Sequence, residues 1–300
     1  MKADYMKENP DYILQYIVFG NQRFFNEALF SIASAWRFIK KSNYKIKIVI
    51  YTDNESFFKN LPVQTIHLDN NIWNDWTGKD NYTYRSKIIC IKDCIERFNV
   101  QTIFIDTDTI FINNPDNIYE KIVEGYNFMH FNEGLPNKKL MSFINDNKIK
   151  NWIDQELTIK PTYNIWNSGV VAINKNNSKF IYKIIEFNDL YFNVSKYFAT
   201  EQFAFSVILD DNNTLLPAND IIFHYWHAVL KKDFQKKFNL MISELGKDNL
   251  DKWADNLDKY WPIWPIKEKP GIRLRVLLYK SGLFPKFKSL SALFITKPDL

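Results

Sequence analysis

The stretch TIFIDTDTIF, residues 102–111, is the most informative segment of this chain. Its apolar and β-branched residues run into Asp106 and Asp108, a pattern typical of a buried strand that ends at a polar edge. Residues two apart in an extended chain project to the same side, so we expect the two carboxylates to converge. Converging carboxylates repel each other unless a cation lies between them. The stretch therefore predicts a metal site, with a simple acidic turn as the alternative.

The segments on both sides of this stretch alternate between strand-like and helix-like patterns. Apolar runs predict strands at 12–19, 45–53, 63–68 and 102–106, and further strands at 126–131 and 169–174. Helical spacing of apolar residues predicts helices at 24–41, 82–98, 177–192 and 200–209. Such alternation predicts an α/β fold with a mixed, mainly parallel central sheet flanked by helices on both faces.

Ligands of open α/β sheets bind beyond the carboxyl ends of the strands. Gly20-Asn21 and Thr52-Asp53 end the first two strands and should reach the edge that carries the two carboxylates. The helix that leads into residues 102–106 begins at this edge, and its first turn carries Arg85 and Lys87. These two cations would lie beside Asp106 and Asp108, where a metal-bound diphosphate needs positive charge. The alternative for each is an exposed surface role. The residues predicted to bind a ligand at this edge are Phe19, Gly20, Asn21, Thr52, Asp53, Arg85, Lys87, Asp106 and Thr107.

The net positive charge of the chain comes from its last 30 residues. Residues 271–300 hold six of the 39 basic residues and one of the 34 acidic ones, so the first 270 residues balance at 33 of each. An enzyme that acts on nucleic acid would line its main groove with Lys and Arg, so no nucleic-acid partner is expected. The proline-rich segment 261–271 predicts a boundary before a basic, helical tail. This tail could touch an anionic membrane surface, or pack as ordinary helices.

The two cysteines and the hydropathy pattern predict the compartment. Cys90 and Cys94 lie four residues apart in a predicted helix, and the chain has no further Cys to complete a metal site. We therefore predict that the two cysteines are reduced and buried. No apolar run reaches the roughly 18 residues that a membrane span needs, and the N-terminus shows no signal-peptide cleavage site. We therefore expect a cytoplasmic protein, with peripheral contact to the inner face of the cytoplasmic membrane through 271–300 as an open alternative.

Four segments resemble those of the GT-A fold nucleotide-diphospho-sugar transferases, most nearly glycosyltransferase family 8. They are YRSK (84–87) with TIFIDTDTIF, NIWNSGVVAIN (164–174), TEQFAFSVIL (200–209) and HYWHAVLK (224–231). The resemblance implies an enzyme that moves a sugar from a nucleotide-diphosphate donor, expected to be a UDP-sugar, onto a hydroxyl of a bacterial surface glycan or glycolipid, with retention favoured. It implies a GT-A domain over 1–262, with a nucleotide-binding half at about 1–115 and an acceptor half at about 116–262, followed by the extension 263–300.

The same resemblance assigns a metal site. In this family the Asp-X-Asp holds a divalent metal, and a late His is the third ligand, which here implies Asp106, Asp108 and His224, with His227 as a rival. A structural, hydrogen-bonded histidine is the alternative for each imidazole. Carboxylate and phosphate oxygens with one imidazole suit Mn²⁺ or Mg²⁺ better than Zn²⁺.

The resemblance also assigns the sugar-binding and catalytic residues. The family's Asn-Ala/Ser-Gly turn lines the sugar pocket, and its Asp-Gln or Glu-Gln pair lies beside the reacting carbon. In the family, a Gly and a Lys-Pro-Trp follow the late His. This chain departs from that pattern, because Trp226, His227 and Ala228 stand in this stretch and no Pro follows Lys231. The residues implied are Asn167, Ser168 and Gly169 for the sugar, Glu201, Gln202 and Asn167 for catalysis, and Lys231 for the diphosphate.

Two other functions compete with this prediction. A haloacid-dehalogenase-type phosphohydrolase also places Asp-X-Asp after an apolar strand, uses Mg²⁺, and could find its distal acidic pair in VILDDN, residues 207–212. Three predicted strands precede the motif, and Thr109 replaces the usual Gly after the second Asp, which argues against this class. The second alternative is a non-catalytic module that binds a sugar nucleotide or a glycan.

Overall fold

The core of the molecule is a seven-stranded sheet in the order β10-β6-β9-β4-β1-β2-β3. The computed structural model describes residues 9–136, 138–157, 164–177, 179–210, 214–226 and 228–260. The sheet consists of β1 (Tyr12–Val18), β2 (Ile46–Thr52), β3 (Gln64–His67), β4 (Gln101–Ile105), β6 (Asn127–Met129), β9 (Val170–Ile173) and β10 (Leu215–Pro217). Its neighbouring strands pair in parallel except at β9, which runs antiparallel to both β4 and β6.

The reversed strand β9 brings distant segments to one edge. Ile105 at the end of β4 pairs with Val170 at the start of β9, so the residues just before β9 lie beside those just after β4. Two short ribbons extend this edge: β5 (Thr109–Phe111) pairs with β11 (Ile222–His224), and β7 (Asn132–Gly134) pairs with β8 (Ile165–Trp166). The carboxyl edge of the sheet is therefore built from four segments that are far apart in the chain.

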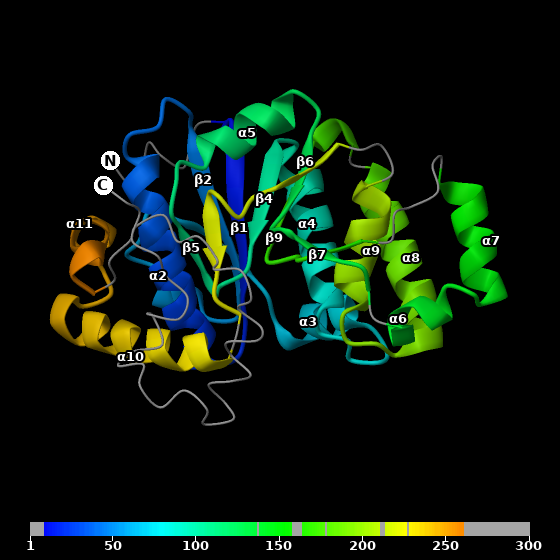
Figure 1. The fold of residues 1–300 in the computed structure, drawn as a ribbon. Helices are drawn as coiled ribbons and strands as arrows, with labels where there is room; N and C mark the ends of the chain where they lie inside the picture. The colour runs from blue at the N-terminus through cyan, green and yellow to red at the C-terminus, as the bar shows by residue number, and fades with distance from the viewer. Residues whose placement is uncertain are drawn as a thin grey trace, which may run out of the picture.

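Helices cover both faces of the sheet, as Figure 1 shows. Alternate residues of β1 serve the two faces: Tyr12, Leu14 and Tyr16 belong to one buried cluster, while Ile13 belongs to the other. The first face is covered by α2 (Gln22–Ile39), α5 (Asp116–Val123), α10 (Ala228–Leu245) and α11 (Leu250–Tyr260). The second is covered by α3 (Asn70–Thr77), α4 (Arg85–Phe98), α6 (Lys138–Phe143), α7 (Asn147–Glu156), α8 (Lys179–Ser195) and α9 (Thr200–Leu209), and two 3₁₀ turns lie at Glu55–Phe57 and Lys175–Asn177.

This architecture confirms the predicted α/β fold with its mixed, mainly parallel sheet. Cys90 and Cys94 are free and buried on α4, and the Gln15 amide donates a hydrogen bond to the Cys90 sulfur. Within the described part of the chain, no helix combines the length and the apolarity that crossing a membrane requires. The predicted boundary at 261–271 and the basic tail lie outside the described residues.

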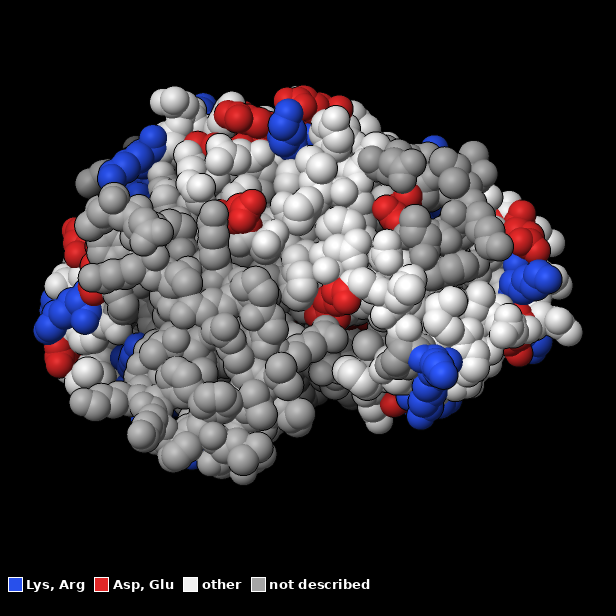
Figure 2. All heavy atoms as spheres, in the orientation of Figure 1, with Lys and Arg blue, Asp and Glu red and all other residues white. Residues whose placement is uncertain are grey.

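The surface seen in Figure 2 carries its charges mostly around the rim of the view. Lys and Arg side chains are scattered there, and the described surface between them is largely uncharged with isolated acidic groups. Over the described residues of this face there is thus no extended basic patch, in keeping with the balanced charge of the first 270 residues.

Candidate active site

The loop that follows β4 is held in place by helix α2. Glu27, Ser31 and Ser34 form a buried polar stripe on this helix, at the spacing that puts side chains on one face. The stripe meets alternate residues of the loop and of β5. Thr107 donates to Glu27 at 3.2 Å, the hydroxyls of Ser31 and Thr109 are 2.8 Å apart, and the Phe111 amide donates to Ser34 at 2.9 Å. Because Thr107 and Thr109 face the helix, the intervening Asp108 and the preceding Asp106 face away from it.

Asp106, Asp108 and His224 converge on the other side of this loop. Thr109 of β5 pairs with His224 of β11, which carries the imidazole to the two carboxylates from more than a hundred residues away. One potential ligand atom from each of the three residues lies within 4.8 Å of the others. Asp108 is 6% exposed and the Asp106 side chain 26%, so the cluster opens to solvent on the Asp106 side. The structure thus brings the three predicted metal ligands together.

The His224 ring is held from both nitrogens. Nδ1 lies 2.9 Å from the Asn167 side-chain oxygen, an acceptor, so Nδ1 carries a hydrogen. Nε2 lies 3.2 Å from Asp108 Oδ1 and 3.9 Å from Asp106 Oδ2. Nε2 therefore faces two carboxylates at a point where either a proton or a metal ion would balance their charge.

Gly169 makes room for this imidazole. A Cβ atom at position 169 would lie 2.1 Å from His224 Nδ1, closer than any real contact. On another side, the buried His130 ring stands edge-on to His224 with ring centroids 5.4 Å apart, and His130 Nε2 donates to the Ile222 carbonyl. Burial lowers the pKa of His130 to about 3, so this ring stays neutral and supports His224 by packing. The position of the predicted third ligand is thus fixed by its neighbours.

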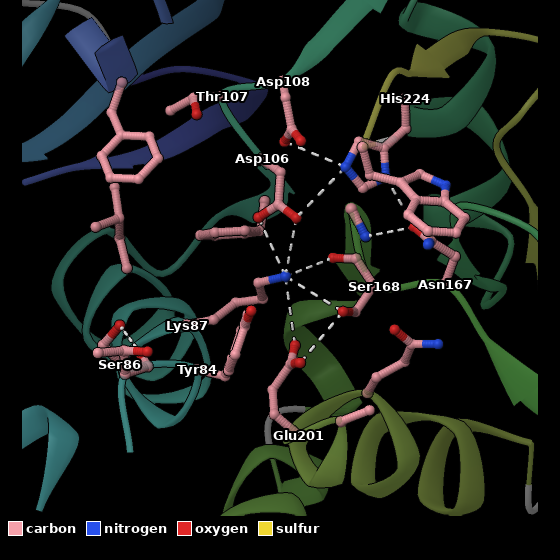
Figure 3. A pocket seen from close by; sticks show the side chains of 18 of the residues that line it. Tyr84, Ser86, Lys87, Asp106, Thr107, Asp108, Asn167, Ser168, Glu201 and His224 are labelled. Atoms are coloured by element: carbon pink, nitrogen blue, oxygen red, sulfur yellow. Dashed lines mark hydrogen bonds and ion pairs between the residues drawn. The ribbon is translucent and has the colours of Figure 1, made fainter. Parts of the chain in front are cut away.

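Two lysines neutralise the carboxylates, as Figure 3 shows for Lys87. Lys87 Nζ lies 3.1 Å from both oxygens of Asp106, donates to the Ser168 carbonyl at 2.9 Å, and is 3.4 Å from Glu201 Oε1. Lys231 Nζ, from α10, lies 2.6 Å from Asp108 Oδ2. Burial alone would lower the pKa of Lys87, but Asp106 and Glu201 hold it above its ordinary value. Burial would likewise raise the pKa of Asp108, yet His224 and Lys231 hold it well below its usual range.

Glu201 is a second buried acid that lines the cavity beside Asp108. It lies in the first turn of α9, and its backbone N–H donates to the Tyr82 hydroxyl, which itself donates to the Phe198 carbonyl. The Ser168 hydroxyl donates to Glu201 Oε2 at 3.3 Å. Burial raises the pKa of Glu201 to about 7, although Lys87 acts against this. A carboxyl that ionises near neutral pH can accept or release a proton during a reaction.

These groups line one cavity of about 550 Å³, a size typical of small-molecule sites. Most of the predicted site residues meet in it. Those that line the cavity are Phe19, Lys87, Asp106, Thr107, Asp108, Asn167, Ser168, Gly169, Glu201, Gln202, His224 and Lys231.

Five predicted residues are not brought to the cavity, and each has another structural role. Gly20, with φ +79°, turns the chain after β1 and donates its N–H to Asp53. Asn21 caps α2, and Thr52 is buried and accepts from the Asn54 N–H. Arg85 forms a two-point ion pair with Asp189 of α8 at 2.8 and 2.9 Å and also donates to the Trp76 carbonyl, so its guanidinium points away from Asp106. His227 lies outside the described residues.

The structure adds residues that the sequence analysis missed. Arg23, Phe24, Trp73, Tyr84 and Phe198 also line the cavity, and the last two are 48% and 65% exposed at its edge. Glu27 is fully buried, and burial together with Asp108 raises its pKa. A single acid on the buried face of an apolar helix was the available sequence signal for Glu27.

No protein-family model matches the sequence, and no curated protein matches it either. Among solved structures, the chain is similar to the galactosyltransferase LgtC in complex with donor and acceptor sugar analogues, at 11% identity over 81% of this chain and 95% of that one, with a TM-score of 0.44. It is also similar to the mannosyltransferase Ktr4p from S. cerevisiae in complex with GDP, at 11% identity over 72% and 71% of the two chains, with a TM-score of 0.48.

A third similar structure is the apo form of the bifunctional glycosyltransferase WbbM, at 11% identity and a TM-score of 0.47. The alignment covers 70% of this chain and 39% of that one, so this chain spans well under half of WbbM. Likenesses at this level establish neither a family nor an activity, and the function is therefore inferred from the site itself.

Proposed function

We propose that this chain is a divalent-metal-dependent glycosyltransferase that moves a sugar from a nucleotide-diphosphate donor, a UDP-sugar, onto an acceptor hydroxyl. One observation carries the proposal: Asp106, Asp108 and His224 place ligand atoms within 4.8 Å of one another in the wall of a cavity that also holds the buried Glu201. A cation site and an acid of raised pKa in one cavity suit a reaction that separates charge.

The chemistry of the ligand set fits a hard divalent cation. Two carboxylates and one imidazole leave further coordination positions for phosphate oxygens and water, which favours Mn²⁺ or Mg²⁺. When bound, such a cation would supply Lewis-acid stabilisation to a departing diphosphate. Asp106, Asp108 and His224 are the residues that would hold it.

Residues of the chain would complete the charge stabilisation on the leaving-group side. Lys87 and Lys231 already lie beside the two carboxylates, at 3.1 and 2.6 Å, and both line the cavity. Fixed cations of this kind stabilise negative charge that develops on a departing diphosphate. A cation bound beside Asp108 would repel the Lys231 ammonium group, which lies 2.6 Å from Asp108 Oδ2, so we propose that this group then turns to the diphosphate.

On the sugar side, Glu201 is the residue best placed to act. Sugar transfer builds positive charge at the anomeric carbon, which a nearby carboxylate stabilises. Lys87 holds Glu201 Oε1 at 3.4 Å and Ser168 holds Oε2 at 3.3 Å, so the carboxyl group has a fixed direction. We assign Glu201, Gln202 and Asn167 to catalysis at the reacting sugar carbon. The turn Asn167, Ser168 and Gly169 would bind the sugar hydroxyls. We propose that the transfer retains the configuration of the sugar.

The exposed rim of the cavity supports a carbohydrate acceptor. Tyr84 and Phe198 line the cavity, and each residue exposes about half of its surface or more. The Tyr82 hydroxyl, bonded to the Phe198 carbonyl, ties the two loops that carry them. Aromatic faces exposed at a cavity mouth suit the apolar face of a sugar ring, and we propose that a surface glycan or glycolipid binds there.

The phosphohydrolase alternative gains no support from the site. Asp210 follows α9 and does not line the cavity, so the segment 207–212 does not supply a distal acid within the described residues. The Thr109 side chain faces Ser31 of α2 instead of the cavity.

A panel of nucleotide sugars with Mn²⁺ tests the proposal. Release of nucleotide diphosphate is measured for the wild type, for Asp108→Ala and for Asp154→Ala, a control on the exposed face of α7. The wild type and the control should turn over one or more donors. The rate of nucleotide diphosphate release by Asp108→Ala should be more than about 100-fold lower, because this variant lacks a metal ligand. Donor affinity without turnover would identify a binding module, and phosphate release without any sugar nucleotide would identify a phosphohydrolase.

A further inference from the structure

Glu133 of β7 bridges two primary amides beside the candidate metal site. Its Oε1 accepts a hydrogen bond from Asn167 Nδ2, and its Oε2 accepts one from Gln202 Nε2, both at 3.2 Å. The register between β7 and β8 shifts between Asn132 and Gly134, which is where Glu133 lies, and such bulges re-aim a side chain. Because a carboxylate only accepts, both amides must turn their NH₂ groups toward Glu133.

This contact decides the direction of the Asn167 amide. With Nδ2 turned to Glu133, the side-chain oxygen of Asn167 lies on the opposite side and accepts from the Gly169 N–H at 3.0 Å and from His224 Nδ1 at 2.9 Å. A flipped amide would place its NH₂ group against the Gly169 N–H and would leave Glu133 Oε1 facing an oxygen. Two independent contacts therefore select one orientation of a side chain that is only 6% exposed.

The amide direction in turn decides which nitrogen of His224 is available to a cation. The Asn167 oxygen accepts only when Nδ1 carries the hydrogen, which leaves Nε2 as the nitrogen that faces Asp108 and Asp106. With the Asn167 amide reversed, Nδ1 would become the acceptor and the hydrogen would move to Nε2, where it blocks coordination.

We infer that Glu133 is a positioning residue: its contact with the Asn167 amide fixes the Nδ1–H form of His224 and so directs Nε2 to the cation site. The same carboxylate holds Gln202, which joins the metal ligand and the sugar side of the cavity in one hydrogen-bonded chain. The inference rests on the proposed function insofar as a cation binds at Asp106, Asp108 and His224.

Exchange of donor and acceptor tests the inference. Glu133→Gln replaces one of the two acceptors with an NH₂ group, so the Asn167 and Gln202 amides can no longer both donate to position 133 and the hold on the Asn167 orientation is weakened. In the double variant E133Q/N167D, the new amide at position 133 donates to the new carboxylate at position 167 and accepts from Gln202. That carboxylate in turn accepts from Gly169 and His224, so every contact returns with its direction satisfied. Glu186→Gln on the exposed face of α8 removes a negative charge elsewhere and serves as the control.

Mn²⁺ affinity without nucleotide is measured by titration calorimetry for all four proteins. We expect Glu133→Gln to bind about 10–100-fold more weakly, as for other partners of metal-bound histidines, and the double variant and the control to bind like the wild type. Unchanged affinity in Glu133→Gln, or a loss that the double variant does not restore, would overturn the inference. If Glu133→Gln does not fold, Glu133→Asp, which is too short to reach both amides, replaces it.

A second readout separates this inference from the proposed function. Side-chain ¹⁵N NMR of the metal-free protein reports the protonation of each ring nitrogen, and His224→Asn identifies the His224 signals among the four histidines. Nδ1 should carry its hydrogen in the wild type and in the double variant, and should lose it in part in Glu133→Gln. Identical His224 signals in all three proteins would overturn the inference, whether or not the chain binds a metal or transfers a sugar.

Discussion

At the scale of single residues, Gly169 shows how a missing side chain can build a metal site. A Cβ atom there would collide with His224 at 2.1 Å. We therefore expect Gly169→Ala to push the imidazole away from Asp106 and Asp108, and to weaken Mn²⁺ binding by roughly 10–100-fold, the range seen when the support of a metal ligand is lost. Calorimetric titration with Mn²⁺ measures the change.

A double-mutant cycle shows whether Gly169 acts through His224. If it does, Gly169→Ala should add almost nothing once His224 has been replaced by Ala, because the ring with which the methyl group collides is gone. Additive losses in the double variant would contradict the steric explanation.

Glu201 should make stability depend on pH. Its pKa is about 7 in the folded protein against an ordinary value of 4.5, so between these values the folded state holds a proton that the unfolded chain has released. The free energy of unfolding of the wild type then falls as the pH rises through this window. Glu201→Gln cannot ionise and lacks this effect. The free energy of unfolding of Glu201→Gln minus that of the wild type should therefore rise by about 3 kcal/mol between pH 4.5 and pH 7.

Urea unfolding at a series of pH values measures this difference. Glu186→Gln on exposed α8 should leave the free energy of unfolding nearly unchanged across the series, because surface substitutions have small effects. A stability difference between Glu201→Gln and the wild type that does not vary with pH would show that burial does not raise the pKa of this carboxyl.

Single residues were predictable where the chemistry sits at the end of a regular apolar run. Asp106, Asp108 and His224 all follow or end such runs, and the structure brings them together. Glu133 was missed because its role depends on contacts with Asn167 and Gln202, 34 and 69 residues away. Arg85 was expected at the ligand because its helix begins at the correct edge, but no local pattern reveals that Asp189 of α8 binds the guanidinium first.

At the scale of elements, helix α10 places Lys231 at the cation site, where its ammonium group competes with a metal ion for Asp108. Lys231 Nζ lies 2.6 Å from Asp108 Oδ2. We expect Lys231→Met to bind Mn²⁺ alone more tightly, because a competing positive charge is gone. The same variant should bind UDP in the presence of Mn²⁺ about tenfold more weakly, because one charge-assisted hydrogen bond is lost.

Lys232→Met, one residue further along the same helix and exposed, is the matched control and should change neither affinity. Weaker binding of Mn²⁺ alone by Lys231→Met would contradict the competition between the ammonium group and the metal, since it would show that Lys231 supports the cation site instead of occupying it.

Elements marked by a clear apolar run or stripe were predictable, including the short strands β3, β6 and β9, whereas β5, β11 and the long helix α10 were not. Strands β1, β2, β4 and helix α2 lie within a few residues of their predicted bounds, because long apolar runs and stripes mark them. Strands β5 and β11, which carry His224 to Asp108, are three residues each and too short to show a period. The reversal of β9, which places Asn167 beside Asp106, depends on strand pairing between distant segments and leaves no local pattern.

At the scale of the whole molecule, the site joins the two parts of the chain that the sequence analysis separated near residue 115. Asp106 and Asp108 come from the first part, and His224, Glu201 and Lys231 from the second. That division stays a prediction, but a ligand in this cavity would contact both parts and stabilise the folded molecule as a whole. Ligand binding should therefore be visible in global unfolding.

Thermal unfolding with Mn²⁺ and UDP tests this coupling. At ligand concentrations of about 100 times Kd the folded state gains roughly 3 kcal/mol, which for a chain of this size raises the Tm by roughly 5 °C. Because metal and diphosphate would bind each other, the two together should raise the Tm by more than the sum of their separate effects. Asp106→Asn should abolish this excess, and purely additive shifts in the wild type would contradict a shared site.

The most direct measurement is an anomalous difference map from a crystal of the wild-type protein grown with Mn²⁺ and UDP. The proposed function predicts one strong peak about 2.0–2.4 Å from oxygens of Asp106 and Asp108 and from Nε2 of His224, with the diphosphate on its open side. A peak elsewhere in the molecule, or carboxylates that remain closed on Lys87 and Lys231 with no peak between them, would contradict it.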